Sequence, residues 1–418
     1  MSATFVVPAQ RYRMAVEGSL LWLQVAMGLS FIAVAPLFPL IIDDYGIDNA
    51  TTSLLIGAGE LVFAIAIIPG GVLAARFGWR RATILGGALM SIMVLAPLAD
   101  SFAVLLLLRV LFAVGAAIAI GSLPAAVMSW FPARELPLIN GVNVVGQSIG
   151  VTVGVFTAAF IADLIGWRET LMAFGLVTLA GTGLFALLAR DATPLPGTTV
   201  QPPFSVAELR AIMRERSTLL LGLGVGGGFA TFIGLNAWLP TYYQEEFGFS
   251  LAKAGAVTAI PSFFGIVGSL LGSTLPMRLG RRRPLIMLSG AVMPFVAIGS
   301  FISDAPLVLF PSLALFGIST WLYFPSALTM PMELPGMTPE RATVAVATML
   351  TVGSVSGFFA PLLVGFLRDQ TGGFEAGLTI CALLPVSLVV AGYLLPETGP
   401  RGQLRVQPST EPACSAQS

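Results

Sequence analysis

Two charged side chains lie inside long apolar stretches of this sequence. Glu60 falls in GAGELVFAIAIIPGG, which covers residues 57–71, and Arg109 begins the segment RVLFAVG. An isolated charge at the centre of a membrane costs roughly 2.5–3.5 kcal/mol, so such a residue indicates a function or a partner. Burial favours the neutral carboxyl, whereas a nearby guanidinium favours the carboxylate. Helix movement or an arriving ligand could therefore change the protonation of Glu60, and the chemistry that this predicts is proton coupling.

A fixed ion pair between Glu60 and Arg109 is the alternative interpretation. At a helical rise of about 1.5 Å per residue, counting from the outer ends of the two stretches places Glu60 roughly 13 Å and Arg109 roughly 11 Å deep. Small residues at this level would let helices approach closely; they are Gly57, Ala58, Gly59, Ala113 and Gly115. A permanent pair would only lock the helices together, and the sequence leaves both interpretations open.

The composition indicates that these elements are membrane helices. Of the 418 residues, 56% are hydrophobic and 10% are charged, and the mean hydropathy is +0.90, whereas soluble domains carry about a quarter charged residues. Apolar stretches of about 20 residues, long enough to cross the hydrocarbon core as a helix, recur along the chain. We expect an all-α membrane protein with twelve spans, at residues 18–42, 51–74, 82–99, 102–129, 138–165, 170–189, 219–243, 252–275, 285–302, 306–330, 342–367 and 376–395.

The loops divide into two sets by charge. ARFGWRR at residues 75–81 and MRLGRRR at residues 277–283 are basic, whereas the opposite loops hold Asp48, Asp100 and Glu245. The positive-inside rule then places the basic loops and both termini in the cytoplasm. We expect a multi-pass protein of the cell membrane, which in a bacterium is the inner membrane.

The chain repeats itself about halfway. PLIIDDYGI at residue 39 recurs as PTYYQEEFGF at residue 240, and VGQSIG at residue 145 recurs as VGSVSG at residue 352. Parallel repetition of two six-helix units is typical of one large class of secondary transporter, with the substrate site between the halves. We expect a six-helix bundle over residues 1–190, a second one over residues 219–396, and a disordered cytoplasmic tail over residues 397–418.

A polar linker over residues 191–218 separates the two predicted bundles. Within it, Ser205 and Glu208 have the spacing of a capping box, and the hydrophobic residues that flank them suit a staple. We expect a short amphipathic helix at this point on the membrane surface, with arginines directed toward phosphates or water.

The basic loops carry a family resemblance. GVLAARFGWRR resembles the GxxxDRxGxRR signature of the major facilitator superfamily, although Ala75 replaces its aspartate and Met277 does so in the second copy. The matching residues, which the resemblance implies form a gating loop, are Gly71, Arg76, Gly78, Arg80, Arg81, Arg278, Gly280, Arg282 and Arg283. The resemblance therefore covers the glycines and the basic residues of the signature but not the acids of the family's cytoplasmic charge network.

Further segments support this resemblance. RVLFAVG resembles the RxxxGxG motif of the fourth span, and the fifth span lacks the Gly-Pro motif typical of drug/proton antiporters. AWLPTYYQEEFGFSLAKAG, from Ala237, and GFFAPLLVGFLRDQTGGF, from Gly357, are most similar to the branch of cyanate and nitroimidazole transporters. The resemblance implies two six-helix bundles that rock around a central site.

In this superfamily the first span of each three-helix group lines the cavity. The candidate substrate contacts that this implies are Gln24, Ser30, Asn236, Trp238, Trp321, Tyr323 and Ser326. Each of these side chains could equally serve helix packing or lie in an interfacial belt.

Several activities are excluded or disfavoured by residue types that are missing. The sequence has no histidine and two cysteines, Cys381 and Cys414, so a His-ligated metal and a disulfide framework are excluded. It has no GxxxxGK[ST] loop, so ATP-driven transport is not expected, and its short basic loops are explained without nucleic acid. We expect no cofactor, and a monomer whose partners are the lipid bilayer, a small-molecule substrate and protons.

The combined prediction is a secondary transporter that moves a small organic solute, and within that class a small organic anion coupled to protons. Export of a drug-like compound is the alternative transport function. A non-transporting receptor or scaffold on the same fold is a further alternative, and an enzyme is disfavoured because no nucleophile and base are paired.

Overall fold

The computed structural model describes residues 10–131, 136–190, 211, 213–333 and 339–398, and in this part every regular element is a helix. That agrees with a chain whose backbone polar groups must be satisfied without water. The N-terminal bundle consists of α1 (Gln10–Phe31), η1 (Ala35–Leu37), α2 (Phe38–Tyr45), α3 (Asn49–Phe77), α4 (Trp79–Met90), η2 (Ser91–Leu98), α5 (Phe102–Trp130), α6 (Leu136–Ile165) and α7 (Trp167–Leu188).

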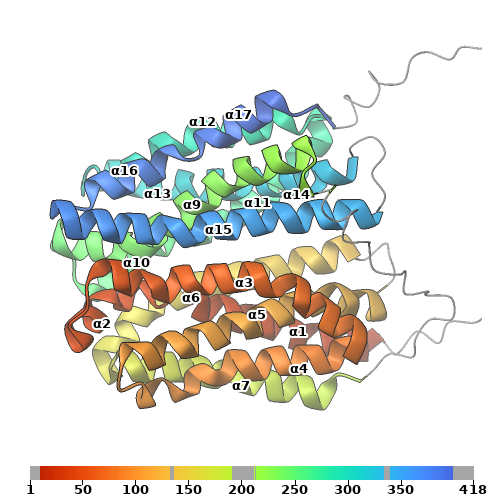
Figure 1. Cartoon of the computed structure of the whole chain (residues 1–418), viewed down its shortest axis with the longest axis horizontal. Coiled ribbons are helices and arrows are strands. Elements are labelled where there is room, and N and C mark those ends of the chain that lie inside the picture. Colours follow the sequence, from red (N-terminus) through yellow and green to blue (C-terminus); the bar gives the residue numbers. More distant parts are fainter. Residues whose placement is uncertain (1–9, 132–135, 191–210, 212, 334–338, 399–418) are drawn as a thin grey trace, which may run out of the picture.

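The C-terminal bundle repeats this arrangement. It consists of α9 (Arg216–Glu245), α10 (Leu251–Thr258), α11 (Ile260–Leu279), α12 (Arg283–Gly299), α13 (Pro306–Leu322), α14 (Phe324–Glu333), α15 (Pro339–Thr371), α16 (Glu375–Leu383) and α17 (Val386–Leu394). The two bundles lie one above the other in Figure 1, with α3 and α15 side by side where they meet. On the other flank of the interface α6 contacts α10 and α11.

The apolar helices correspond to the predicted spans. Eleven helical segments of the described chain are long and apolar enough to cross a membrane, and α12 is a shorter apolar helix at the ninth predicted span. The predicted all-helical membrane fold is therefore confirmed. Most of the amphipathic helix that we predict from Ser205 lies outside the described residues, as does the tail beyond residue 398.

Charged side chains hold helices together at both ends of the bundles. We call the end where α1 begins and α17 ends the terminus end, and the opposite end the far end. At the terminus end Arg283 donates from Nε to the carbonyl of Gly392 at 2.6 Å. At the far end Arg168 pairs with Asp44 at 2.5 Å and Arg368 pairs with Glu245 at 2.7 Å, so these two far-end arginines are balanced by acids.

Glycines form the two short turns that the repeat predicts at the terminus end. Gly78 between α3 and α4 has a φ of 88°, and Gly280 before α12 has a φ of 64°. Both values lie in the region that side chains with a Cβ rarely adopt. A tight helix-to-helix turn at equivalent places in the two halves therefore requires glycine.

Candidate functional site

A cavity of about 220 Å³ lies between the two bundles. Its lining comes from α1, α3, α5 and α6 on one side and from α9, α11, α13, α14 and α15 on the other. The lining residues are Met27, Phe31, Ile32, Glu60, Phe63, Ile67, Ile120, Val144, Gln147, Ser148, Val151, Phe229, Phe232, Ile233, Ser262, Thr320, Trp321, Tyr323, Phe324, Leu350 and Ser354. Among these residues Glu60 is the only acidic or basic side chain, so any charge inside the cavity wall comes from it.

Glu60 faces the opposite bundle. Its side chain is 3% exposed, and it shares a hydrogen bond with the hydroxyl of Ser354 on α15. A Cβ added to Gly357, one turn further along α15, would lie 3.6 Å from Glu60 Cγ, which is ordinary contact distance. The carboxyl therefore sits at the point where α3 and α15 meet, and at the edge of the cavity.

No direct ion pair joins Arg109 to Glu60 among the described residues, although the two buried side chains attract each other electrostatically. In the described part of the chain its guanidinium instead donates to three backbone carbonyls: those of Ser30 at 2.8 Å, Phe31 at 2.6 Å and Leu55 at 3.1 Å. Leu55 precedes Glu60 on α3 by five residues, which is about 7.5 Å along a helix. The hydrogen-bond partners of Arg109 are therefore backbone carbonyls on the far-end side of Glu60.

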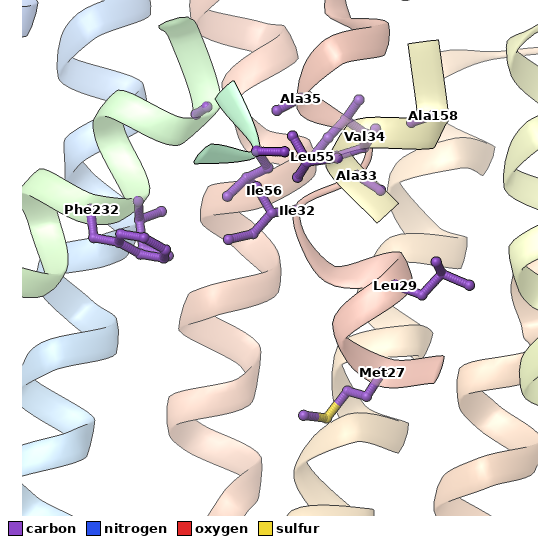
Figure 2. Close-up of a cluster of buried hydrophobic side chains, with 14 of the residues drawn as sticks. Met27, Leu29, Ile32, Ala33, Val34, Ala35, Leu55, Ile56, Ala158 and Phe232 are labelled. Carbon is purple, nitrogen blue, oxygen red and sulfur yellow. The ribbon is translucent and has the colours of Figure 1, made fainter. Parts of the chain in front are cut away.

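A break in the first span explains why Arg109 binds carbonyls. α1 ends at Phe31, and the N–H of Ala35 donates to the carbonyl of Ile32 at 2.9 Å, so that it does not bond Phe31 as an unbroken helix would require. The last carbonyls of a helix need other donors, and a cation at this end also complements the helix dipole. Figure 2 shows Ile32, Ala33 and Val34 in the break, beside Leu55 and Ile56 of α3. Arg109 thus caps the broken helix.

Two of the seven predicted substrate contacts, Trp321 and Tyr323, line the cavity. The other five are buried but are not among the residues that line it. The indole of Trp238 donates to the carbonyl of Pro361 at 3.0 Å, and the amide of Asn236 donates to Phe232 at 2.8 Å. The remaining three, Gln24, Ser30 and Ser326, are each at most 6% exposed. A role of any of the seven in substrate binding stays a prediction.

Several polar residues of the cavity were not among the substrate contacts predicted from the sequence, although the internal repeat points to them. Gln147 and Ser354 are the third residues of VGQSIG and VGSVSG, and both line the cavity, on α6 and α15. The alignment that superposes Gly78 on Gly280 also superposes Glu60 on Ser262, which lines the cavity from α11. Because equivalent positions of two related bundles face the shared axis, this pairing was a signal that could have identified them.

The predicted gating loops hold their arginines within each bundle. Arg282 forms a two-point ion pair with Glu333 of α14, at 2.6 and 2.7 Å, and its backbone N–H donates to Glu397 at 2.8 Å. Arg80 donates to the carbonyl of Ala186 at 2.9 Å. Met277 stands where the family signature has an aspartate, and in the C-terminal bundle Glu333 and Glu397 supply carboxylates to Arg282 instead. The gating function of these loops stays a prediction.

At the far end, α15 and α3 are joined by a carboxylate. Asp369 accepts from the N–H of Ala50 at 2.9 Å and from the side-chain amide of Asn49 at 2.8 Å, so it caps the first turn of α3 from the other bundle. Ser53 also donates to the carbonyl of Pro361 at 2.9 Å. These contacts lie on the far side of Glu60, whereas the cavity extends past Glu60 to Ile67 and Leu350, toward the terminus end.

Comparison with known proteins agrees with this architecture. A sequence profile of the Major Facilitator Superfamily matches residues 20–361. The chain is 26% identical to a probable sulfoacetate transporter of Cupriavidus necator, with 86% of this chain and 88% of that protein covered. It is 25% identical to a quinolone resistance transporter of Acinetobacter baumannii, with 84% and 86% covered.

A solved structure supports the fold. A bacterial homologue of the human lysosomal transporter Spinster, in an inward-facing and unoccupied conformation, superposes with a TM-score of 0.74 at 17% sequence identity. The match covers 96% of this chain and 100% of that structure.

Proposed function

The chain belongs to the Major Facilitator Superfamily, and we propose that the solute it carries is a small organic anion that travels with a proton bound at Glu60. The chain is an integral, multi-pass membrane protein and a secondary transporter of a small organic solute. The observation that carries the finer proposal is the position of Glu60 as the only charged group in the described cavity lining, at a contact between the two bundles.

Electrostatics would couple the anion to the proton. Two like charges about 4–5 Å apart repel by roughly 3–4 kcal/mol at an effective dielectric constant of 20. An ionised Glu60 would therefore exclude an anion from the cavity, whereas a protonated Glu60 adds a hydrogen-bond donor. Because each ligand then favours binding of the other, anion and proton would bind together. The sulfoacetate transporter among the relatives supports an anion as the solute.

The position of Glu60 also suggests how binding is linked to movement. Its carboxyl is hydrogen-bonded to Ser354 across the interface, so loss or gain of its proton alters a contact between α3 and α15. The contacts of Asp369 and Ser53 hold the far end closed, and an arrangement open toward the terminus end fits the extent of the cavity. In our proposal the two bundles then rock about this interface.

Export of a drug-like compound is the second candidate function. It is favoured by the likeness to a quinolone resistance transporter and by the many apolar residues of the lining. Against it, the cavity of about 220 Å³ is smaller than the roughly 300–1,000 Å³ of pockets for drug-sized ligands. The branch of cyanate and nitroimidazole transporters stays a proposal based on the segments from Ala237 and Gly357. We propose neither an enzymatic activity nor a receptor role.

A flux assay in proteoliposomes tests the proposed function. The full chain is reconstituted with a pH-sensitive dye inside, an inward proton gradient is imposed, and sulfoacetate, gluconate or benzoate is added outside. We expect at least one of these anions to acidify the vesicle interior and to accumulate in it at a saturable rate above that of empty vesicles, which benzoate also enters as the neutral acid. Flux of an uncharged drug-like probe in the absence of any anion flux would instead favour the second candidate.

A further inference from the structure

We propose that the solute is a small aromatic monocarboxylate, whose ring lies against a wall of aromatic side chains and whose carboxylate meets the few free hydrogen-bond donors of the cavity. This inference rests on the proposed function and names the substrate class of the same site. It is carried by the distribution of rings and of unused donors around the cavity.

Four rings of the C-terminal bundle form a continuous surface, which we call the aromatic wall. It consists of Phe229, Phe324, Trp321 and Phe232, in this order. The centroids of neighbouring rings are 5.8, 5.5 and 5.9 Å apart, within the range of favourable ring pairs. All four residues line the cavity. Because neighbouring rings are tilted by 40°, 79° and 77° to one another, a flat solute would find both ring faces and ring edges to pack against.

The opposite side of the cavity places rings next to the acid. Phe63 follows Glu60 on α3 by three residues, so the two lie on the same face of the helix. Phe31 of α1 packs edge-on against Phe63, with centroids 6.1 Å apart. An aromatic solute would therefore have rings on both sides, while Glu60 marks where its polar group belongs.

Few donors in the cavity are free to bind an anion. Ser148 already donates to the carbonyl of Val144 at 3.1 Å, and Thr320 donates to Phe316 at 2.8 Å. Ser354 is bonded to Glu60. Ser262, by contrast, is 3% exposed and its Oγ has no partner in the described chain. A buried hydroxyl without a partner is costly, which points to a ligand that supplies an acceptor.

The free groups are enough for one carboxylate but not for a polyhydroxylated acid. Ser262, the side-chain amide of Gln147 and a protonated Glu60 could donate to the oxygens of one carboxylate. The lining adds only two other donors without a described acceptor, the phenol of Tyr323 and the indole N–H of Trp321. Gluconate adds five hydroxyl groups, and each hydroxyl left without a partner loses affinity. The size of the cavity, about 220 Å³, also favours a solute with one ring. These limits select a monocarboxylate with an apolar, flat body.

The test compares three carboxylates of equal charge on the reconstituted full chain. Benzoate has an aromatic ring, cyclohexanecarboxylate has a saturated ring of similar size, and gluconate has hydroxyl groups. We expect benzoate to show an apparent KM roughly 2- to 12-fold lower than cyclohexanecarboxylate, the range of a favourable ring pair. We expect gluconate to give no flux above that of empty vesicles.

Variants of the aromatic wall test its part in this preference. Trp321→Leu should bring the KM values for benzoate and cyclohexanecarboxylate close to each other, while saturable flux of cyclohexanecarboxylate above that of empty vesicles shows that the variant is folded. Phe295→Leu is the matched control, because this ring is 78% exposed and lies outside the cavity lining. The control should keep the wild-type preference. If Trp321→Leu does not fold, the ratio of the KM values for benzoate and cyclohexanecarboxylate in the wild type still tests the proposal.

Two outcomes separate this inference from the proposed function. Proton-linked flux of gluconate or sulfoacetate without benzoate flux would overturn the aromatic substrate class and leave the proposed function standing. Calorimetric binding of benzoate to the purified protein, without proton-linked flux of any of these anions, would overturn the proposed function and retain the substrate class. Equal KM values for benzoate and cyclohexanecarboxylate in the wild type would also overturn the inference.

Discussion

The contacts of Arg109 lead to a quantitative prediction for its removal. Arg109→Ala deprives three carbonyls, those of Ser30, Phe31 and Leu55, of their donor, and it removes the cap of the broken helix α1. A buried carbonyl without a partner costs roughly 1–3 kcal/mol, and partial access of water lowers the sum. We therefore expect the free energy of unfolding to fall by roughly 3–6 kcal/mol, measured by reversible denaturation in mixed micelles.

A double-mutant cycle decides whether Arg109 acts through Glu60. If the two residues formed a buried ion pair, removing one partner would leave an uncompensated charge, and a coupling energy of roughly 3–5 kcal/mol would result. The structure gives Arg109 backbone partners and leaves it only an electrostatic attraction to Glu60 without direct contact, so we expect the losses from Arg109→Ala and Glu60→Gln to add to within about 1 kcal/mol. Arg109→Lys should be nearly as destabilising as Arg109→Ala, because an ammonium cannot reproduce the guanidinium fork. Strong coupling, or rescue by lysine, would refute the helix-capping role.

Two further predictions concern the far end of the bundles. Asp48 caps α3 by accepting from the N–H of Thr51 at 2.7 Å, and hydrogen bonding with the side chain of Thr51 and then with this N–H holds the pKa of Asp48 below its usual value. The pKa of Asp48 is lower in the folded than in the unfolded protein, so the ionised carboxylate stabilises the fold at pH values above the unfolded-state pKa, and this stabilisation is lost as the carboxylate is protonated. Asp48→Ala should therefore lower the free energy of unfolding by about 1 kcal/mol at neutral pH, and by progressively less as the pH of a denaturation series falls below about 4. The corresponding cap of α10, Ser250, does not ionise, so Ser250→Ala should show a loss that is independent of pH; a pH-dependent loss there would contradict the assignment. Asp369→Ala removes the hydrogen bonds that join α15 to α3 at the far end. If these bonds favour the closed far end by about 1–2 kcal/mol, their loss raises the population open to that side roughly 5- to 30-fold. In a Ser262→Cys background, the cysteine should then react faster by the same factor with an impermeant thiol reagent added from the far side. Asp304→Ala, in another far-end loop, should leave this rate unchanged, and an equal rate in both variants would contradict a latch at Asp369.

The helical fold could be predicted from the sequence because each span must satisfy its own backbone within the bilayer. Apolar length alone located these helices, and the repeated basic turns around Gly78 and Gly280 related the two halves. The break in the first span was harder to predict. Pro36 lacks only the N–H that would bond the carbonyl of Ile32, so it does not by itself indicate that the carbonyls of Ser30 and Phe31 are the ones that Arg109 binds.

The candidate site could be predicted only in part, because the sequence does not fix how each helix is rotated about its axis. Glu60 stood out because a charge in an apolar stretch is unusual, and it does line the cavity. Ser262 and Ser354 did not stand out, because serines are common at helix contacts and the direction in which each side chain points depends on helix rotation. Comparison of equivalent positions in the two halves carries that information better than the residue type does.

The central claim is that a proton on Glu60 drives the solute across the membrane, and Glu60→Gln tests it most directly. In proteoliposomes this variant should lose pH-driven accumulation of the anion that the wild type concentrates, yet retain counterflow of that anion, because glutamine keeps a neutral side chain in the cavity. Glu17→Gln is the matched control: Glu17 is a buried acid of α1, is bonded to Asn143 at 2.7 Å and does not line the cavity. It should accumulate the anion as the wild type does. Undiminished pH-driven accumulation by Glu60→Gln would contradict the account.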